Sequence, residues 1–275
     1  IQLLDATETA HRTGSNSFHG SLFDPRTGTI QPLSYARGLA HAAIRAGAAL
    51  HERTKVTRVR RMGDGWQVTA NNHTITAGAL LLATNAYFDG IDMPQRPAFV
   101  GVNYCQFATA PRPEPLRARI LAGGEGCWDT ALVMSSFRTD RAGRMIVGGI
   151  GDAGGAGASI HLNWAWRKLR QIYPQLAALP FEHSWHGRIA MTGDHIPKIL
   201  ELGPSGYACF GYSGRGIGPG SLFGTSAAAA LLEGRKDGLP VSPVSQHRER
   251  MVQSRAAYYE GGAVLTHAFS PRSFS

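Results

Sequence analysis

The sequence predicts an α+β protein in which strands predominate in the middle of the chain. Short alternating apolar segments fill residues 94–151, segments with helical periodicity lie on both sides of them, and glycine is frequent, at 34 of 275 residues. Glycine at this density indicates many tight turns and places where backbone approaches something closely. With 43% hydrophobic residues, the chain can bury a large core in one domain or two interleaved ones.

The first third of the chain combines turns, one helix and short strands. Residues 18–35 are expected to form two short extended pieces joined by turns that contain proline and glycine. A helix is predicted from Ser34 to about Ala46, with an alanine-rich face suited to packing on a sheet, and Gly47 ends it. Strands are then expected at residues 49–51, 56–60, 66–70, 73–76 and 78–84.

The rest of the chain alternates strands with three helices. Arg144–Ile150 is the clearest strand, and two more are expected at residues 183–189 and 207–211. The helices are expected at residues 163–172, 216–232 and 243–259, the last followed by a disordered tail.

Composition and charge narrow the class of protein. Three widely separated cysteines indicate free thiols in a cytoplasmic protein and not a disulfide framework. The net charge of +9 comes from scattered basic residues with one cluster at 58–61, so we do not expect nucleic-acid binding. No apolar run is long enough to span a membrane. The first residues lack an initiating Met and the features of a signal peptide, so we expect the chain to begin mid-protein.

Three motifs only partly meet the requirements of a known chemistry. The glycines of segment 149–154 have the spacing of a dinucleotide fingerprint, but no helix opens there and no acidic residue lies between Asp152 and Glu182. The pair His183-x-x-His186 is strand-like, so we expect no metal site. Ser213 lies in a loose match to a nucleophile elbow, and a serine hydrolase that uses Ser213 is a minor alternative.

The strongest signal is a series of three segments at residues 185–188, 191–199 and 211–218. They predict a strand, a turn closed by proline, a second strand, and a glycine loop that opens a small-residue helix. Backbone amides at such a helix start carry partial positive charge and favour an anionic group. Small residues there let a flat ring approach the backbone, although a plain glycine-rich turn is the alternative.

These segments resemble the C-terminal flavin motif of the D-amino-acid oxidase family of FAD-dependent oxidoreductases. The resemblance rests on Trp-x-Gly at 185–187, Thr-x-Asp-x-x-Pro at 192–197 and Gly-Tyr-Ser-Gly-x-Gly at 211–216. Upstream segments, including Leu-Leu-Ala-Thr-Asn-Ala-Tyr at 81–87, are also similar, and the match covers about residues 1–235 in order. Within the family, the sequence is most similar to γ-glutamylputrescine oxidoreductases and glycine/sarcosine-oxidase-like proteins.

The resemblance implies FAD as the cofactor and an amine or amino acid as the substrate. The implied reaction moves a hydride from the carbon beside the amine to flavin N5, after which the imine hydrolyses and oxygen or another acceptor reoxidises the flavin. The implied contacts are with the adenine, the pyrophosphate and ribityl chain, and the flavin ring. In chain order, the residues implied in these contacts are Val56, Ala83, Thr84, Gly187, Gly214, Arg215, Gly216, Ile217 and Gly218.

Two arginines are candidates for substrate binding. Amino-acid oxidases of the family often carry a carboxylate-binding arginine in the Trp-x-Gly strand, but Arg188 follows Gly187 directly, and a shift of one residue changes the face of a strand. A carboxylate clamp and a solvent-facing arginine therefore both stay open for Arg188. Arg215 places a cation near the expected flavin edge, where it raises the electron affinity of the flavin or binds substrate. No side chain is assigned as a catalytic acid or base.

The implied architecture is part of a FAD/NAD(P)-binding domain, with a mixed sheet plus helices, interleaved with an antiparallel-sheet substrate domain. Residues 34–88 and 190–235 are expected in the FAD domain, 1–33 and 89–189 in the substrate domain, and 236–275 in a closing helix and tail. The family's N-terminal βαβ unit is expected upstream of this chain or on a partner chain. A truncated or degenerate chain that serves only as a structural subunit is the alternative.

Overall fold

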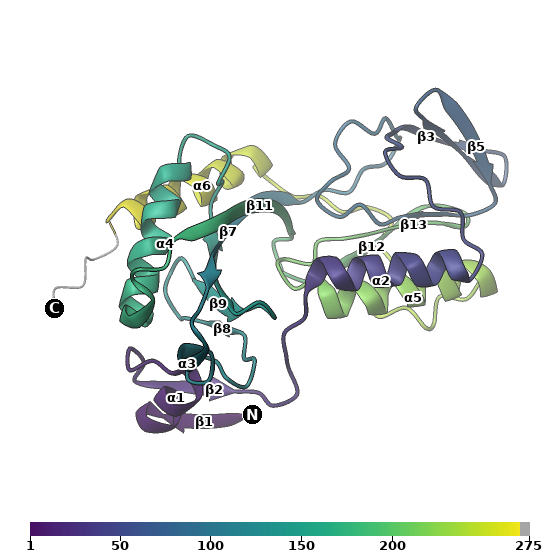
Figure 1. The fold of residues 1–275 in the computed structure, drawn as a ribbon. Helices are drawn as coiled ribbons and strands as arrows, with labels where there is room; N and C mark the ends of the chain where they lie inside the picture. Colours follow the sequence, from purple (N-terminus) through teal and green to yellow (C-terminus); the bar gives the residue numbers. More distant parts are fainter. Residues whose placement is uncertain (270–275) are drawn as a thin grey trace. The chain divides into compact units, whose positions relative to one another are not determined.

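The protein folds into two compact units built from alternating parts of the chain. The computed structural model describes residues 1–269, with the helices and strands shown in Figure 1. Unit 1 comprises residues 1–35, 103–187 and the described residues from Ala257 onward, and unit 2 comprises residues 36–102 and 188–256. Mixed and antiparallel sheets accompanied by helices confirm the predicted α+β class.

Unit 1 begins with a small motif for which the sequence predicted no element before residue 18. Strand β1 (Gln2–Asp5) pairs antiparallel with β2 (Gly20–Phe23), and helix α1 (Ala6–Thr13) connects them. Asp5 accepts the backbone N–H of Glu8 at 2.8 Å, and Glu8 accepts the N–H of Asp5 at 3.0 Å. This reciprocal capping box is visible in the sequence as an acidic residue followed three positions later by Glu.

The strand-rich middle of the chain forms a five-stranded sheet, with the order β11-β7-β10-β9-β8. Its strands are β7 (Val100–Pro111), β8 (Cys127–Trp128), β9 (Ser136–Thr139), β10 (Arg144–Ile150) and β11 (Phe181–Met191). Strand β10 pairs antiparallel with both β7 and β9, and β8 pairs antiparallel with β9. The strand predicted at 144–150 is therefore correct, and the one predicted at 183–189 lies within the longer β11.

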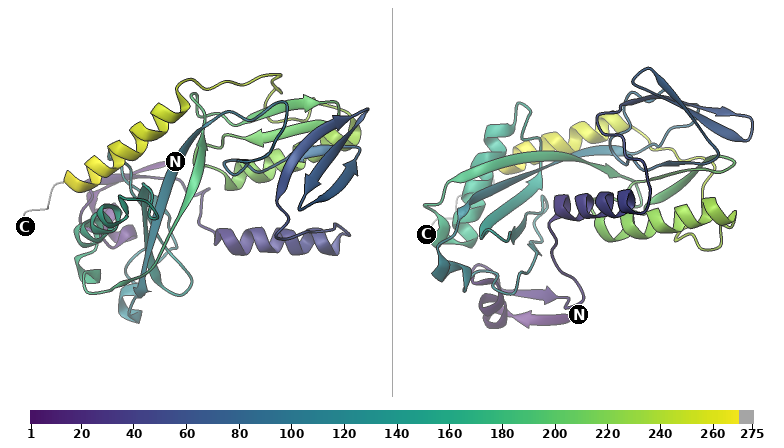
Figure 2. Two further views of the ribbon diagram at one scale, coloured as in Figure 1. Left: turned by 90° about the horizontal axis from the view of Figure 1, so that it is seen from above. Right: turned by 45° about the vertical axis from the view of Figure 1, so that its right-hand side comes forward.

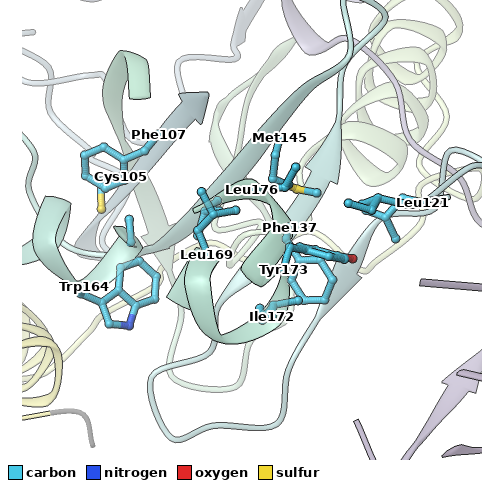
Figure 3. Packing of buried hydrophobic residues seen from close by; sticks show 13 residues of the cluster. Cys105, Phe107, Leu121, Phe137, Met145, Trp164, Leu169, Ile172, Tyr173 and Leu176 are labelled. Atoms are coloured by element: carbon cyan, nitrogen blue, oxygen red, sulfur yellow. The ribbon is translucent and has the colours of Figure 1, made fainter. Parts of the chain in front are cut away.

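Helix α4 (Ala158–Ile172) covers this sheet in unit 1, with the short elements α3 (Glu114–Arg117) and η1 (Pro174–Leu176) beside it. Trp164, Leu169 and Ile172 of α4 pack against Phe107, Phe137 and Met145 of the strands in the core that Figure 3 shows. The prediction began this helix at residue 163, five residues too late. Gly157 precedes the helix without a side-chain cap, so no capping residue marks the true start.

Unit 2 contains two three-stranded sheets. Strands β3 (Val56–Met62), β4 (Gly65–Ala70) and β5 (His73–Ala77) form an antiparallel meander, as the turn residues predicted. The second sheet has the order β12-β13-β6, from β6 (Leu80–Leu82), β12 (Lys198–Gly203) and β13 (Gly206–Phe210). Strand β6 is parallel to β13 and β12 is antiparallel to it.

The two helices that adjoin unit 2 differ in how they are buried. Helix α5 (Ile217–Glu233), predicted to within one residue, buries Phe223, Ala227 and Ala230. Helix α2 (Pro32–Arg45) has no buried residue, and Figure 2 (left view) shows it clear of the strands of unit 2. Leu39, on the predicted packing face, is exposed, so no described residue covers this face.

Three further predictions need correction. No strand forms at residues 49–51, and the predicted strand 78–84 is reduced to the three residues of β6. The closing helix is α6 (Val252–Phe269), so it begins nine residues later than predicted, because residues 243–251 are irregular, with bends and an isolated β-bridge from Val244 to Leu200. The predicted disordered tail lies outside the described residues. Among residues 1–269, no helix is both long and apolar enough to cross a membrane.

Candidate functional site

The parallel strands β6 and β13 bring two of the predicted cofactor segments to one edge of the sheet. Leu82 of β6 lies opposite Ala208 of β13, and both strands run in the same direction. Ala83 and Thr84 follow β6, and the glycine loop, residues 211–218, follows β13. Ligands of open α/β sheets bind outside the carboxyl ends of such strands. Two segments more than a hundred residues apart in sequence thus meet where a ligand is expected.

The glycine loop takes a conformation that most residues avoid. Gly211 and Gly214 have φ values of 81° and 87°, and Ser213 has 50°. The N–H of Ser213 donates to the carbonyl of Ala190 at 3.0 Å, and the Ser213 Oγ accepts the N–H of Thr192 at 3.3 Å. These bonds hold the loop against the end of β11, so its backbone is fixed before helix α5 begins.

Space around the later glycines of the loop is open within the described residues. A Cβ built on Gly218 would meet no atom within 4 Å, and one on Gly216 would meet only the Cβ of Tyr212, at 3.8 Å. Gly214, Arg215, Gly216, Ile217 and Gly218 are all exposed. Gly216, as the N-cap of α5, has no side chain to bond the first N–H groups of the helix. The loop therefore presents backbone amides to open space.

Thr84 carries one of the two buried polar atoms in this region that lack a hydrogen-bond partner among the described residues; the other is the Nε of Arg188. The Thr84 atom is the hydroxyl Oγ1. A buried hydroxyl without a partner costs about 1–3 kcal/mol, so such a group calls for a ligand or water. Ala83 beside it is exposed, and Val56, at the start of β3, is partly exposed. The predicted residues Ala83 and Thr84 thus have the accessibility and the chemistry of a ligand-binding edge.

Arg188 is engaged by its own chain. Its backbone N–H donates to the Tyr87 hydroxyl at 2.7 Å, and its Nη2 donates to the Ala86 carbonyl at 2.7 Å and to the Asp89 carboxylate. Its Nε, in contrast, is buried and has no hydrogen-bond partner among the described residues. Its neighbour Ile189 points the other way, with its Cδ1 3.7 Å from the position of a Cβ on Gly214. Gly187, immediately before Arg188 in β11, is the last residue of this segment of unit 1.

Ser213 does not have the contacts of a hydrolase nucleophile. Its Oγ donates to the Gly211 carbonyl at 3.2 Å and accepts the N–H of Thr192, so both described partners are backbone groups. His247 is bonded to Glu249 at 3.1 Å, and His267 belongs to unit 1. The hydroxyl instead stabilises the glycine loop.

The two other weak motifs have structural roles. The glycines of segment 149–157 lie against side chains: a Cβ on Gly149 would come within 2.5 Å of Trp164, and one on Gly151 within 2.5 Å of His161. His186 pairs with Asp152, whose pKa is lowered by the N–H of Gly154 and by His186. Among residues 1–269, no three metal-ligating side chains come together in a metal site.

Two residues that shape this region were not among the predicted site residues. Asn85 accepts the N–H of Gly211 through its Oδ1 at 3.1 Å, and its φ of 45° is in the left-handed region. Glu249 accepts the N–H of Gly193 at 2.7 Å and binds Arg255 at 2.6 Å. Burial opposes ionisation of Glu249, but these donors keep its pKa below the usual range. The position of Asn85 directly after a predicted strand could have indicated a residue in the left-handed conformation. Nothing in the sequence indicated a role for Glu249.

The order of these segments matches a known family along most of the chain. Residues 1–230 match the family described as FAD dependent oxidoreductase. The chain belongs to this family. A probable oxidoreductase OrdL from Rhizobium meliloti is 32% identical over 228 residues, covering 79% of this chain and 50% of that protein. The γ-glutamylputrescine oxidoreductase of Escherichia coli is 27% identical over 232 residues, covering 84% of this chain and 54% of that protein.

Solved structures share the fold. Glycine oxidase from Geobacillus kaustophilus superposes with a TM-score of 0.73 at 20% identity, covering 90% of this chain and 67% of that one. L-proline dehydrogenase from P. horikoshii gives 0.69 at 21% identity, covering 87% and 66%. The predicted partial FAD-binding and antiparallel architecture is thereby confirmed as a fold. The chain spans about half the length of the curated relatives that it matches.

Proposed function

We propose that this FAD-dependent oxidoreductase oxidises the C–N bond of an amine or amino acid, as part of a complete flavoprotein. The observation that carries the proposal is the partnerless, buried Thr84 hydroxyl at the same sheet edge as the exposed amides of the glycine loop. Relatives named γ-glutamylputrescine oxidoreductase and glycine oxidase support an amine or amino acid as the substrate. The serine-hydrolase alternative has no support in the contacts of Ser213.

The residues at this edge fit an anionic, flat cofactor. We assign Thr84 and Ala83 to the pyrophosphate and ribityl chain, because a hydroxyl and an open backbone segment suit a polar linker. Val56 is assigned to the adenine. The N–H of Arg215 is bonded to the Tyr212 carbonyl at 2.9 Å, so the amides of Gly214 and of residues 216–218 at the start of α5 would stabilise negative charge on the ring edge that they face. Bound FAD supplies the hydride acceptor, and the chain orients the substrate C–H bond and excludes water.

The two arginines receive different proposals. Arg215 is exposed on the glycine loop, where its cation would stabilise negative charge on the ring edge or attract an anionic part of the substrate. Arg188 remains a candidate for a substrate carboxylate, because its Nε is buried without a hydrogen-bond partner among the described residues, whereas its Nη2 is held by Ala86 and Asp89. Gly187 would let the ring approach the strand closely, since glycine has no Cβ. We assign no catalytic acid or base.

The two units correspond to the two roles of the family fold. We propose that unit 2 carries the FAD-binding residues and that the antiparallel sheet of unit 1 belongs to the substrate domain. Helix α2 exposes Leu39 and Ile44, at 52% and 47%, and has no buried residue. An upstream segment of the same protein, or a partner chain, is the occupant that we propose for this face, because the relatives are about twice as long. The unpaired cysteines support a cytoplasmic location.

The test is a visible absorption spectrum of the complete protein, with its upstream segment or partner chain, followed by bleaching with a panel of amines and amino acids. We expect a flavin spectrum that at least one primary or secondary amine bleaches without oxygen. Thr84→Val removes the hydroxyl with little change in shape and should weaken FAD binding about tenfold. Thr76→Val, on the exposed side of β5, is the matched control and should leave FAD binding unchanged. A protein that holds no flavin, or that no amine reduces, would refute the proposal.

A second experiment tests the proposal that an upstream segment or a partner chain completes the protein. Residues 1–275 alone should bind FAD weakly, because Ala83 and Thr84 would contact the pyrophosphate without the glycine fingerprint and acidic residue of the family's N-terminal βαβ unit. Fluorescence titration of FAD measures this affinity. Submicromolar binding by residues 1–275 as a folded monomer would contradict the need for an upstream or partner segment.

A further inference from the structure

Asn85 links the two segments that the candidate cofactor edge contains. Strand β6 ends at Leu82, whereas its parallel partner β13 continues to Phe210. The next N–H along β13 is that of Gly211, which points beyond the end of β6. The Asn85 Oδ1 accepts this N–H at 3.1 Å, across 126 residues of sequence.

The backbone of Asn85 is adapted to this contact. Its φ of 45° is in the left-handed region, where asparagine is tolerated better than other residues with a Cβ. In that conformation the chain turns sharply after Thr84, and the side-chain amide reaches back to the neighbouring strand. Thr84 and Asn85 therefore form one short turn, in which one polar group has no partner and the next is bound to the glycine loop.

Arg188 holds the other end of the same turn. Its Nη2 binds the carbonyl of Ala86 at 2.7 Å and the carboxylate of Asp89, and its backbone N–H binds the Tyr87 hydroxyl. Ala86 is fully buried. The backbone of the turn is thus fastened directly after Asn85, which restricts the positions from which the Asn85 side chain can reach Gly211.

We propose that Asn85 is a positioning residue that sets the spacing between the Thr84 hydroxyl and the backbone amides of the glycine loop. Through the N–H of Gly211, Asn85 keeps the start of the loop in register with Thr84, while Arg188 fixes the turn on its far side. The inference rests on the proposed binding of FAD, because only a bound cofactor would make the Thr84 turn and the glycine loop two halves of one site. It assigns a role to Asn85 that requires no contact between Asn85 and the cofactor.

The test combines hydrogen exchange of the cofactor-free protein with FAD titration. Asn85→Gly keeps the left-handed conformation and deletes the acceptor, so it should speed exchange of the Gly211 amide about tenfold and weaken FAD binding about tenfold. Asn85→Asp retains an acceptor and should preserve protection of the Gly211 amide. Asn71→Gly is the control: Asn71 has a φ of 46° and accepts the Lys55 N–H at 3.2 Å. It should speed exchange at Lys55 and leave the Gly211 amide unchanged.

Each result decides the proposal. Unchanged exchange at Gly211 in Asn85→Gly would overturn the bond itself. Faster exchange with unchanged FAD affinity would show that Asn85 has a local structural role only, and it would overturn the positioning role. If the unaltered protein binds no FAD, the proposed function fails and the positioning role fails with it, whereas the exchange data still report the Asn85–Gly211 bond separately.

Discussion

Two glycine-rich segments of this chain look alike in sequence and differ in what surrounds them. In segment 149–157, an added Cβ would come within 2.5 Å of Trp164 at Gly149 and within 2.9 Å of Val264 at Gly157. In the glycine loop, residues 211–218, a Cβ on Gly216 or Gly218 would meet nothing closer than 3.8 Å. Glycine makes room for the chain's own side chains in the first segment. In the second, Gly211 does the same, with Thr192 2.5 Å from an added Cβ, whereas Gly216 and Gly218 leave open space.

Glycine therefore has a packing role in segment 149–157 and a proposed binding role in the glycine loop. Segment 149–157 is enclosed by buried rings: His161 and His267 have no exposed surface, and Trp164 stacks on His267 with 3.9 Å between ring centroids. The glycine loop has exposed residues and a helix start at its end. A count of glycines cannot distinguish these cases, whereas the distance to the nearest side chain does.

The largest effect is expected from Gly149→Ala. The added methyl group would come within 2.5 Å of Trp164 Cη2 in the core of unit 1, so we expect the free energy of unfolding to fall by about 3 kcal/mol. Denaturant unfolding measures it. Gly28→Ala, which meets no atom within 4 Å, is the control and should change stability little. Equal stability of the two variants would show that segment 149–157 is not packed as described.

The rings around segment 149–157 should make the protein sensitive to acid. Burial, and then the charge of His161, lower the pKa of His267 to about 3, whereas the unfolded value is 6.5. A lowered pKa gives stability that is complete above pH 6.5 and is lost as the pH falls toward 3. The expected loss is about 1.4 kcal/mol for each pH unit in this window.

Unfolding at pH 7 and pH 5 measures this loss, and His267→Phe removes the titrating group while it keeps a ring against Trp164. The variant should be less stable at pH 7, because His161 loses a bond of 2.7 Å, but it should have a flatter pH dependence. Glu260 also contacts His161 at 3.2 Å and stays in both proteins. The same pH slope in both proteins would exclude His267 as the source.

Charge reversal in the glycine loop should affect function more than stability. Arg215→Glu replaces the exposed cation beside the proposed ring edge, so we expect a lower flavin reduction potential and a rate of reduction by substrate that falls roughly tenfold. Potentiometry and anaerobic stopped-flow spectroscopy measure the two quantities. Arg141→Glu, an exposed residue of unit 1, makes the same charge change as a control. If neither quantity changes in Arg215→Glu, Arg215 does not belong to the site.

The smallest effect on stability is expected from Gly218→Ala, and its sign is opposite to that of Gly149→Ala. Gly218 lies in the first turn of α5 with open space around it, and alanine favours a helix by up to about 1 kcal/mol. Thermal unfolding of the cofactor-free protein should therefore show unchanged or slightly higher stability, while FAD binding weakens. A destabilisation as large as that of Gly149→Ala would remove the contrast between the two segments.

Much of the fold was predictable because its signals are local. Alternating apolar residues identified β10, turn residues identified the meander of β3, β4 and β5, and the glycine loop before small residues identified α5. The start of α4 was not predictable from a cap, since Gly157 provides none. The predicted helix 243–259 was misplaced because residues 243–251 are irregular, and helix periodicity alone cannot locate the start of a helix.

The features of the candidate site also fall into those that the sequence predicts and those that only the structure reveals. The family, the glycine loop and the Ala83–Thr84 segment could all be identified from the sequence. Short motifs and their order along the chain are enough for this, and no knowledge of tertiary contacts is needed. Only the tertiary structure decided that the Thr84 hydroxyl is buried without a partner, that Arg188 is bound to Ala86 and Asp89, and that Asn85 reaches Gly211. A hydrogen bond across 126 residues depends on which strands become neighbours, and that is a property of packing and not of any local pattern.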